Sequence, residues 1–424
     1  MNLLPGDAVV RAFLFLTLLT GCSGSDNHDQ RPGAALECVP AATPTADTGF
    51  TLQPFCAPED PGQGNVWFAA SGEVLALTGY AFPPASDSDA AFVDGWELHF
   101  DHLLTTIDAI TLSENPDQQK GSQLGTGKRV ARVNGPWAVD LSHYDASYLT
   151  GKGGGSELAV PIAALDNQNE NGGAAFATDG TRYAFGFDLI EATDSAQNVN
   201  LDPDALADYQ EMIEHGCTVL YVGRAIFKGD PELAGCVTEA SQARPQAVNF
   251  RFCFESPATY LNCQNPDNDP AEPISSAEDH QRGIAFLTHS SVIAQVTLHT
   301  DHPFWDSVLH DSPAHFDQFA ARAIASGGSA LVTLDDTLGV DYTAYTDRQG
   351  KPVDWRYCID PPTDVHPKLV GAMRFDPHGV PASDTDSDLG LRDYYDFATY
   401  NQSTQGHLNS DGLCYVKRNY PSPN

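Results

Sequence analysis

Short runs of alternating apolar and polar residues, separated by turn-forming residues, make up most of the chain from Val66 onward. Alternation is typical of half-buried strands, because side chains two residues apart share one face. In one such run, Trp96, Leu98 and Phe100 would face a core while the residues between them face solvent. The predicted strands are 66–70, 73–78, 95–100, 103–112, 130–133, 137–141, 182–190, 218–227, 248–254, 283–288, 292–299, 330–334 and 356–359.

Helical signals are fewer. Asp202 and Pro203 precede the segment 205–215 as an N-cap and a first-turn proline, and Ser312 caps a second segment, 313–325, in the same way. Many short strands with isolated helices between them predict a mainly β fold. We expect an antiparallel β-sandwich-like core with a few helices in the connections, stapled by disulfides.

The first 21 residues have the features of an export signal. An apolar run at 12–19, too short to span a bilayer, ends in Leu19-Thr20-Gly21-Cys22. This segment resembles the bacterial lipoprotein signal, which implies cleavage before Cys22 and lipidation of its sulfur. Ser23 stands where inner-membrane lipoproteins usually carry aspartate, which favours the outer membrane or cell surface. A secretory signal without lipidation is the alternative.

The remaining chain divides into two expected parts. Residues 22–65 are rich in Gly, Pro, Ala and Asp and resemble a flexible tether. Residues 66–424 would form the β-rich domain, with a possible subdivision near 238–247. Hydrophobic residues are 41% of the chain and charged residues 19%, so a sizeable core is available.

Cysteine number agrees with export. The chain has nine cysteines, and those other than Cys22 form an even number, which in an oxidising compartment predicts four disulfides. No CxxC motif occurs, which argues against a thiol redox site and against zinc held by cysteines. Pairing each cysteine with its neighbour in sequence predicts Cys38–Cys56, Cys217–Cys236, Cys253–Cys263 and Cys358–Cys414.

A net charge of −35 restricts the partners. Such a chain repels nucleic acid and anionic lipid surfaces and attracts cations, so we expect membrane contact only through the lipid anchor. Solubility is the alternative reason for this charge. No feature of the sequence indicates a protein partner.

The stretch 298–323 is the densest in metal-binding side chains, with four of the chain's 14 histidines. Imidazole binds zinc and copper, and carboxylates can complete such sites or accept hydrogen bonds from the ligands. Pro303 ends the preceding strand and would let histidines three apart reach one ion, with Trp305 as an apolar wall. The predicted metal residues are His299, His302, His310, His315 and Asp301. A hydrophobic plug around 303–305 is the simpler alternative.

Other cation candidates are weaker. His99 and His102 lie in a second LHxDH pattern, but the apolar run after them continues. Asp384, Asp386 and Asp388 alternate as in calcium loops, yet no glutamate stands at the bidentate position, and a solvated acidic turn explains them equally. Turn chemistry also explains the Asp- and Asn-rich segments 166–172 and 265–269.

The histidine and tryptophan neighbourhood at 298–305, together with the export signal, resembles the exported copper-binding proteins of methane-oxidising bacteria. In that family histidines and an oxidised tryptophan hold copper, which implies a copper role here. More broadly, the chain resembles uncharacterised lipoproteins of Gram-negative bacteria, which carries no activity.

Signatures of common enzyme classes are absent, since neither HExxH nor GxSxG occurs. We therefore expect an exported lipoprotein that binds copper or zinc. One alternative is a metal-dependent enzyme of hydrolase type with Asp301 or Asp306 as its base, and another is an adhesion or glycan-binding module without a metal. The polar block 394–409 could line a pocket with His407, but a surface tail held by a Cys358–Cys414 bridge is the favoured interpretation.

Overall fold

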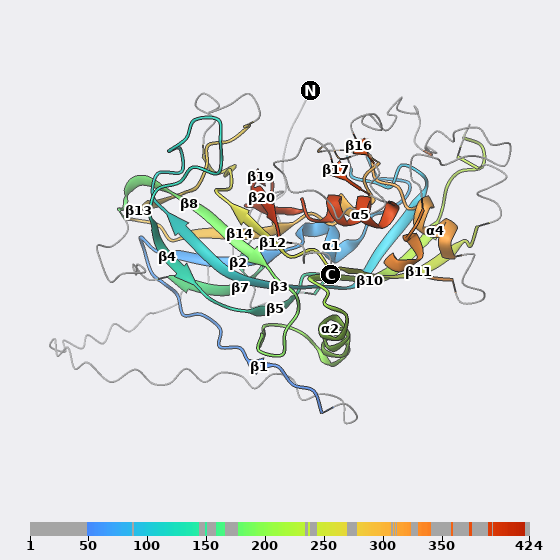
Figure 1. The fold of residues 1–424 in the computed structure, drawn as a ribbon, viewed down its shortest axis with the longest axis horizontal. Helices are drawn as coiled ribbons and strands as arrows, with labels where there is room; N and C mark the ends of the chain where they lie inside the picture. The colour runs from blue at the N-terminus through green and yellow to red at the C-terminus, as the bar shows by residue number, and fades with distance from the viewer. Residues whose placement is uncertain are drawn as a thin grey trace, which may run out of the picture. The chain divides into compact units, whose positions relative to one another are not determined.

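The computed structural model describes residues 49–419, which lie within one compact unit, Cys38–Asn424. Positions 87–88, 144–148, 151–157, 166–176, 234–235, 238–243, 269–277, 307, 309, 311, 324–329, 341–357, 359–372, 375–388 and 392 are not described within that range. The described part is mainly β, as predicted (Figure 1). Most predicted strands coincide with observed ones.

The larger sheet is organised around β3 (Trp96–Ser113). The strands predicted at 95–100 and 103–112 join in it, with a register shift opposite Val222 and Gly223 of β10. Its main path is β1 (Gln53–Pro54), β9 (Gln197–Asn198), β5 (Trp137–Asp140), β3, β10 (Val219–Phe227), β11 (Ala247–Phe254) and β15 (Leu331–Thr333). Branches add β4 (Arg129–Val133), β8 (Asp179–Leu189), β12 (Ala258–Leu261), β13 (Ile284–Leu287) and β20 (Tyr415–Arg418).

The smaller sheet contains β14 (Val292–Leu298), the strand that precedes the histidine-rich stretch, and β18 (Gly406–Leu408), which carries His407. Its order is β19 (Gly412–Leu413), β18, β14, β2 (Val66–Ser71), β7 (Leu158–Leu165) and β6 (Leu149–Thr150). β14 runs parallel to β2 and antiparallel to β18, so the sheets are mixed. A separate short pair joins β16 (Met373–Arg374) to β17 (Leu389–Gly390).

Both main sheets contribute to one core. Phe68 of β2 stacks on Phe185 of β8, with ring centroids 6.2 Å apart. Burial of these aromatic side chains removes much apolar surface from water and is a large favourable term in folding. The sandwich-like arrangement follows from two sheets that share this core.

The helix predicted at 205–215 is α2 (Pro203–His215). The side chain of Asp202 accepts hydrogen bonds from the backbone of Asp204 and Ala205, and Gly216 ends the helix in the left-handed region. Its buried residues pack with Leu104 and Leu220 of the larger sheet. Figure 1 shows α2 below the strands of this sheet.

Two segments that form helices differ from their predictions. The predicted strand 73–78 is the helix α1 (Glu73–Thr78), because Ser71 accepts a hydrogen bond from the Glu73 backbone and the Leu- and Ala-rich segment favours helix. The second predicted helix, 313–325, is observed as α4 (Asp317–Ala323), which begins at Asp317 instead of at residue 313. Asp94, rather than Ser312, accepts the first backbone N–H groups, those of Phe316 and Asp317.

The prediction that 394–409 forms a surface tail is also wrong. The segment contains the buried helix α5 (Tyr394–Gln402) and strand β18. Tyr394, Phe397 and Ala398 all belong to the core. The polar residues of this block therefore line the interior rather than the surface.

Disulfides are present, but the predicted pairs Cys217–Cys236, Cys253–Cys263 and Cys358–Cys414 do not form. The observed bonds are Cys217–Cys253, Cys236–Cys358 and Cys263–Cys414. Cys217 precedes β10 and Cys253 lies on its antiparallel neighbour β11, so strand pairing, not sequence distance, brings them together. Cys56 is also disulfide-bonded, while Cys38 lies outside the described residues.

Several predicted features lie partly or wholly outside the described residues. These include the signal at 1–21 with Cys22, most of the tether and of the boundary region 238–247, most of the strand 356–359, and the calcium candidates Asp384, Asp386 and Asp388. The end of the predicted tether is described, and there β1 pairs with β9. No helix in the described part of the chain is long and apolar enough to cross a membrane.

Candidate metal centre

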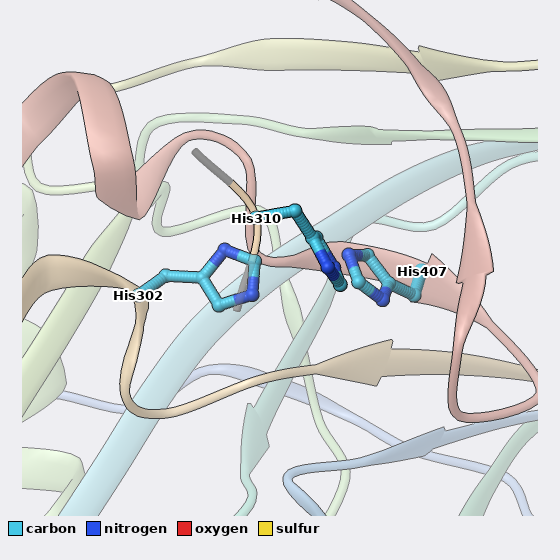
Figure 2. A group of neighbouring side chains, drawn as sticks. All are labelled: His302, His310 and His407. Carbon is cyan, nitrogen blue, oxygen red and sulfur yellow. The ribbon is translucent and has the colours of Figure 1, made fainter. Parts of the chain in front are cut away.

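Three histidines from two distant segments of the chain converge in one place. His302 begins the short 3-10 helix η1 (His302–Phe304), His407 lies on β18, and His310 lies in the connection between Trp305 and Ala314. One nitrogen from each imidazole lies within 4.8 Å of the others. Figure 2 shows the ring of His302 pointing toward the neighbouring rings of His310 and His407.

The local fold explains the convergence. β14 ends at Leu298 and pairs with β18, which sets Thr297 opposite His407. The backbone N–H of His299 then donates to the carbonyl of Gln405, extending this pairing. Pro303 follows His302 at the start of η1, where its missing N–H costs no helical hydrogen bond.

His302 and His407 are buried and favour the neutral form. Their exposed fractions are 0% and 1%. Burial lowers the pKa of His302 well below its usual value, and the neighbouring His407 and His299 add to the effect. Burial lowers the pKa of His407 in the same way, followed by repulsion from His299 and His310. Neutral imidazole is the form that binds metals.

The ring nitrogens of His302 and His407 have few hydrogen-bond partners. Nδ1 of His302 lies 2.8 Å from the hydroxyl of Thr404, whereas its Nε2 has no hydrogen-bond partner. Neither ring nitrogen of His407 makes a hydrogen bond of normal geometry. Backbone groups of Ser410 and Thr404 raise the pKa of His407, but the lowering effect of burial is larger. Such buried polar atoms are normally satisfied, so they are notable here.

His310 and Trp305 complete the surroundings. His310 is exposed, and its ring is nearly parallel to that of His407, with centroids 5.6 Å apart. The Trp305 ring lies 3.7 Å from that of His302, and its Nε1 donates a hydrogen bond to Asp301. Trp305 is thus an apolar wall against one ligand candidate, with solvent reaching the site near His310.

His299 and Asp301 form a second group with His302, again with one potential ligand atom each within 4.8 Å. Nε2 of His299 lies 3.0 Å from the carbonyl of Ser410 and therefore donates to it. Burial opposes protonation of His299, but Glu73 and Asp301 outweigh it and raise its pKa. His299 is consequently less suited to bind a metal than the two neutral histidines.

His315 is not brought into either group. It is fully buried with its ring nitrogens 3.8 Å from Asp94 and 3.4 Å from Asp306. The reason is that Ala314 pairs with Phe92 and Trp305, which turns the next residue toward Asp94. The predicted participation of His315 is therefore not supported by its position.

The weaker histidine candidates also have other partners. His99 contacts Glu97 at 3.1 Å, and His102 contacts Asp140 at 3.0 Å. In the described part of the chain, neither belongs to a group of three side chains able to hold a metal. The LHxDH pattern at 298–302 lies at a strand end, whereas the one at 98–102 continues within β3.

His407 is the main site residue that the metal prediction missed. The sequence places it only among the residues that could line a polar pocket at 394–409. The pairing of β14 with β18 that places it beside His302 joins segments far apart in sequence, and no local pattern reports such a pairing. The density of polar residues around His407 was the available signal.

Three imidazole donors without a thiolate form a set suited to zinc or copper, and the exposed side near His310 gives an ion a path to the site. No protein-family model matches the chain, and no curated protein or solved structure matches it. The function must therefore be inferred from the chain's own residues.

Proposed function

We propose that the protein is an exported lipoprotein that binds copper or zinc through His302, His310 and His407. The observation that carries the proposal is the buried pair of neutral imidazoles, in which Nε2 of His302 and both ring nitrogens of His407 make no hydrogen bond of normal geometry. Leaving a buried polar atom unsatisfied costs about 1–3 kcal/mol. A bound metal would offset that cost, since it accepts the lone pairs that no protein group uses.

The choice of metal follows from the donors. Copper and zinc both bind imidazole nitrogen, whereas calcium and magnesium prefer oxygen. Asp301 and His299 would then act around the ligands: Asp301 accepts a hydrogen bond from Trp305, and His299 donates one to Ser410. Such outer contacts orient ligands and tune affinity.

Export rests on two independent features. The disulfides observed among the described residues fit an oxidising compartment, and the segment ending in Cys22 resembles a lipoprotein signal. An outer-membrane or cell-surface address is part of the proposal. Metabolic labelling with a radioactive fatty acid tests it: wild-type chain should be labelled and a Cys22→Ala variant should not, and an unlabelled wild type would overturn lipidation.

The metal is tested on protein purified without an affinity tag, reconstituted with copper or zinc and freed of excess ion. We expect about one metal per chain in the wild type and loss of it in the His302→Ala, His407→Ala double variant. His289→Ala is the matched control, because His289 is exposed and lies outside both histidine groups. A wild type without stoichiometric metal would overturn the proposal.

A metal-dependent hydrolase is the second candidate. It is favoured by the exposure of His310, which leaves one side of the site to solvent, and by Asp301, which has a carboxylate oxygen within 4.8 Å of ring nitrogens of His302 and His299. Catalysis of this type needs an open coordination position and a nearby base. Azide titration of the copper-loaded protein distinguishes the two: a new absorption band indicates an open position, and an unchanged spectrum indicates a closed storage or capture site.

A further inference from the structure

In the turn between α5 and β18, the hydroxyl group of Thr404 lies 2.8 Å from Nδ1 of His302. We propose that Thr404 is a positioning residue that selects Nε2 as the nitrogen with which His302 binds the metal. The inference rests on the proposed function and assigns one residue of this chain a role in it. Thr404 would not contact the ion itself.

The assignment follows from counting protons. The Thr404 hydroxyl lies 2.7 Å from the carbonyl oxygen of Asn401, which can only accept, so the hydroxyl donates its single proton there. Toward Nδ1 of His302, 2.8 Å away, the same hydroxyl can then only accept. Nδ1 must carry the hydrogen, and in a neutral imidazole the lone pair is left on Nε2.

That lone pair is in the place where a ligand is needed. Nε2 of His302 is buried and has no hydrogen-bond partner. The rings of His407 and His310 lie 5.4 and 5.9 Å from the His302 ring, measured between centroids. The alternative tautomer would bury an N–H group at the centre of the three imidazoles, where it would oppose a cation.

The turn is well suited to hold this hydroxyl. Both the backbone N–H and the side chain of Thr404 donate to the carbonyl of Asn401, at 3.0 and 2.7 Å. Three residues later the same chain supplies His407. One short connection therefore positions one ligand directly and fixes the tautomer of another through a hydrogen bond, as outer-shell partners do in known metal sites.

Thr399, on the preceding helix α5, provides a control with the same substitution. Its side chain is buried, whereas that of Thr404 is half-buried, and the Thr399 hydroxyl has no hydrogen-bond partner. Thr399→Val and Thr404→Val make the same chemical change at two threonines, but only the second removes a hydrogen bond to a site histidine. Thr404→Ser keeps the hydroxyl and is the rescue variant.

The first measurement needs no metal. Nitrogen-15 chemical shifts of the His302 ring in full-length metal-free protein report which nitrogen carries the proton. We expect the Nδ1–H tautomer in the wild type, Thr404→Ser and Thr399→Val, and a mixture of tautomers in Thr404→Val. An Nε2–H ring in the wild type would overturn the inference whether or not the protein binds metal.

The second measurement is copper affinity by competition with a chelator, together with the electron paramagnetic resonance spectrum of the bound Cu(II). Thr404→Val should weaken binding about 10- to 100-fold, the usual effect of losing an outer-shell partner, and change the nitrogen coupling. Thr404→Ser and Thr399→Val should resemble the wild type. Unchanged affinity and spectrum in Thr404→Val would refute the role of Thr404, whereas a wild type that binds no copper refutes the metal function instead.

Discussion

The imidazole rings of His302 and His407 lie 5.4 Å apart between centroids, although they belong to η1 and β18, which are distant in sequence. Both rings are buried and favour the neutral form, whereas His310 is exposed to solvent. The buried and the exposed histidines can therefore be tested by separate substitutions.

Replacing His407 with leucine should stabilise the metal-free protein. The buried ring carries a donor and an acceptor without hydrogen bonds of normal geometry, and an apolar side chain of similar size removes that penalty. We expect the free energy of unfolding in the presence of a chelator to rise by about 1–3 kcal/mol, while copper affinity falls by more than about 100-fold. Urea denaturation and chelator competition measure the two effects. A destabilised His407→Leu protein would show that His407 has protein partners after all.

The Cys263–Cys414 bond should support the site, whereas Cys217–Cys253 should not. Cys414 directly follows β19, whose Leu413 pairs with His407. Replacing either pair with serine should cost about 2–5 kcal/mol in the free energy of unfolding, measured by guanidinium denaturation. Only the Cys263→Ser, Cys414→Ser variant should also lose copper affinity. Equal copper affinity in the two double variants would contradict this assignment.

His102 should make stability depend on pH in a defined direction. The hydrogen bond to Asp140 is the main cause that raises the pKa of His102 above 6.5, against the opposing effect of burial. A raised folded-state pKa stabilises the fold fully below the unfolded-state value, and this contribution is lost as pH rises through the folded-state pKa. The wild type should therefore lose stability relative to His102→Gln as pH increases from about 6 upward. Urea denaturation across pH measures the difference, and parallel curves for both proteins would disprove it.

The sequence predicted the positions of the strands better than it predicted which strands lie next to one another. Alternation identified β3 because one of its faces is buried, and the capping residues Asp202 and Pro203 identified α2. The segment 73–78 was assigned wrongly since six residues are too few for the hydrophobic period to separate helix from strand. Three of the four predicted disulfides were wrong for a different reason: pairing depends on which strands are adjacent, and local patterns do not encode that.

Only those residues of the candidate site that are close together in the sequence could be predicted. His302 and His310 lie close together in sequence, and their density was visible. His407 was missed as a ligand because a long-range strand pair brings it into place, and His315 was included because nothing near it announces that it faces Asp94. Which histidines favour the neutral form depends on burial and on neighbours such as Glu73, so it becomes visible only in the folded chain.

Copper binding should quench the fluorescence of Trp305. Its ring lies 3.7 Å from that of His302, within reach of a paramagnetic ion bound to that histidine. Among the chain's five tryptophans, Trp96 is a suitable comparison, because it is buried in the core and donates its hydrogen bond to Asp317 instead. Titration with Cu(II) should quench part of the wild-type emission, and Trp305→Phe should abolish most of that quenching while retaining stoichiometric copper. Trp96→Phe should leave it intact. Strong quenching that persists in Trp305→Phe would place the copper elsewhere in the protein and contradict the assignment of His302 as a ligand.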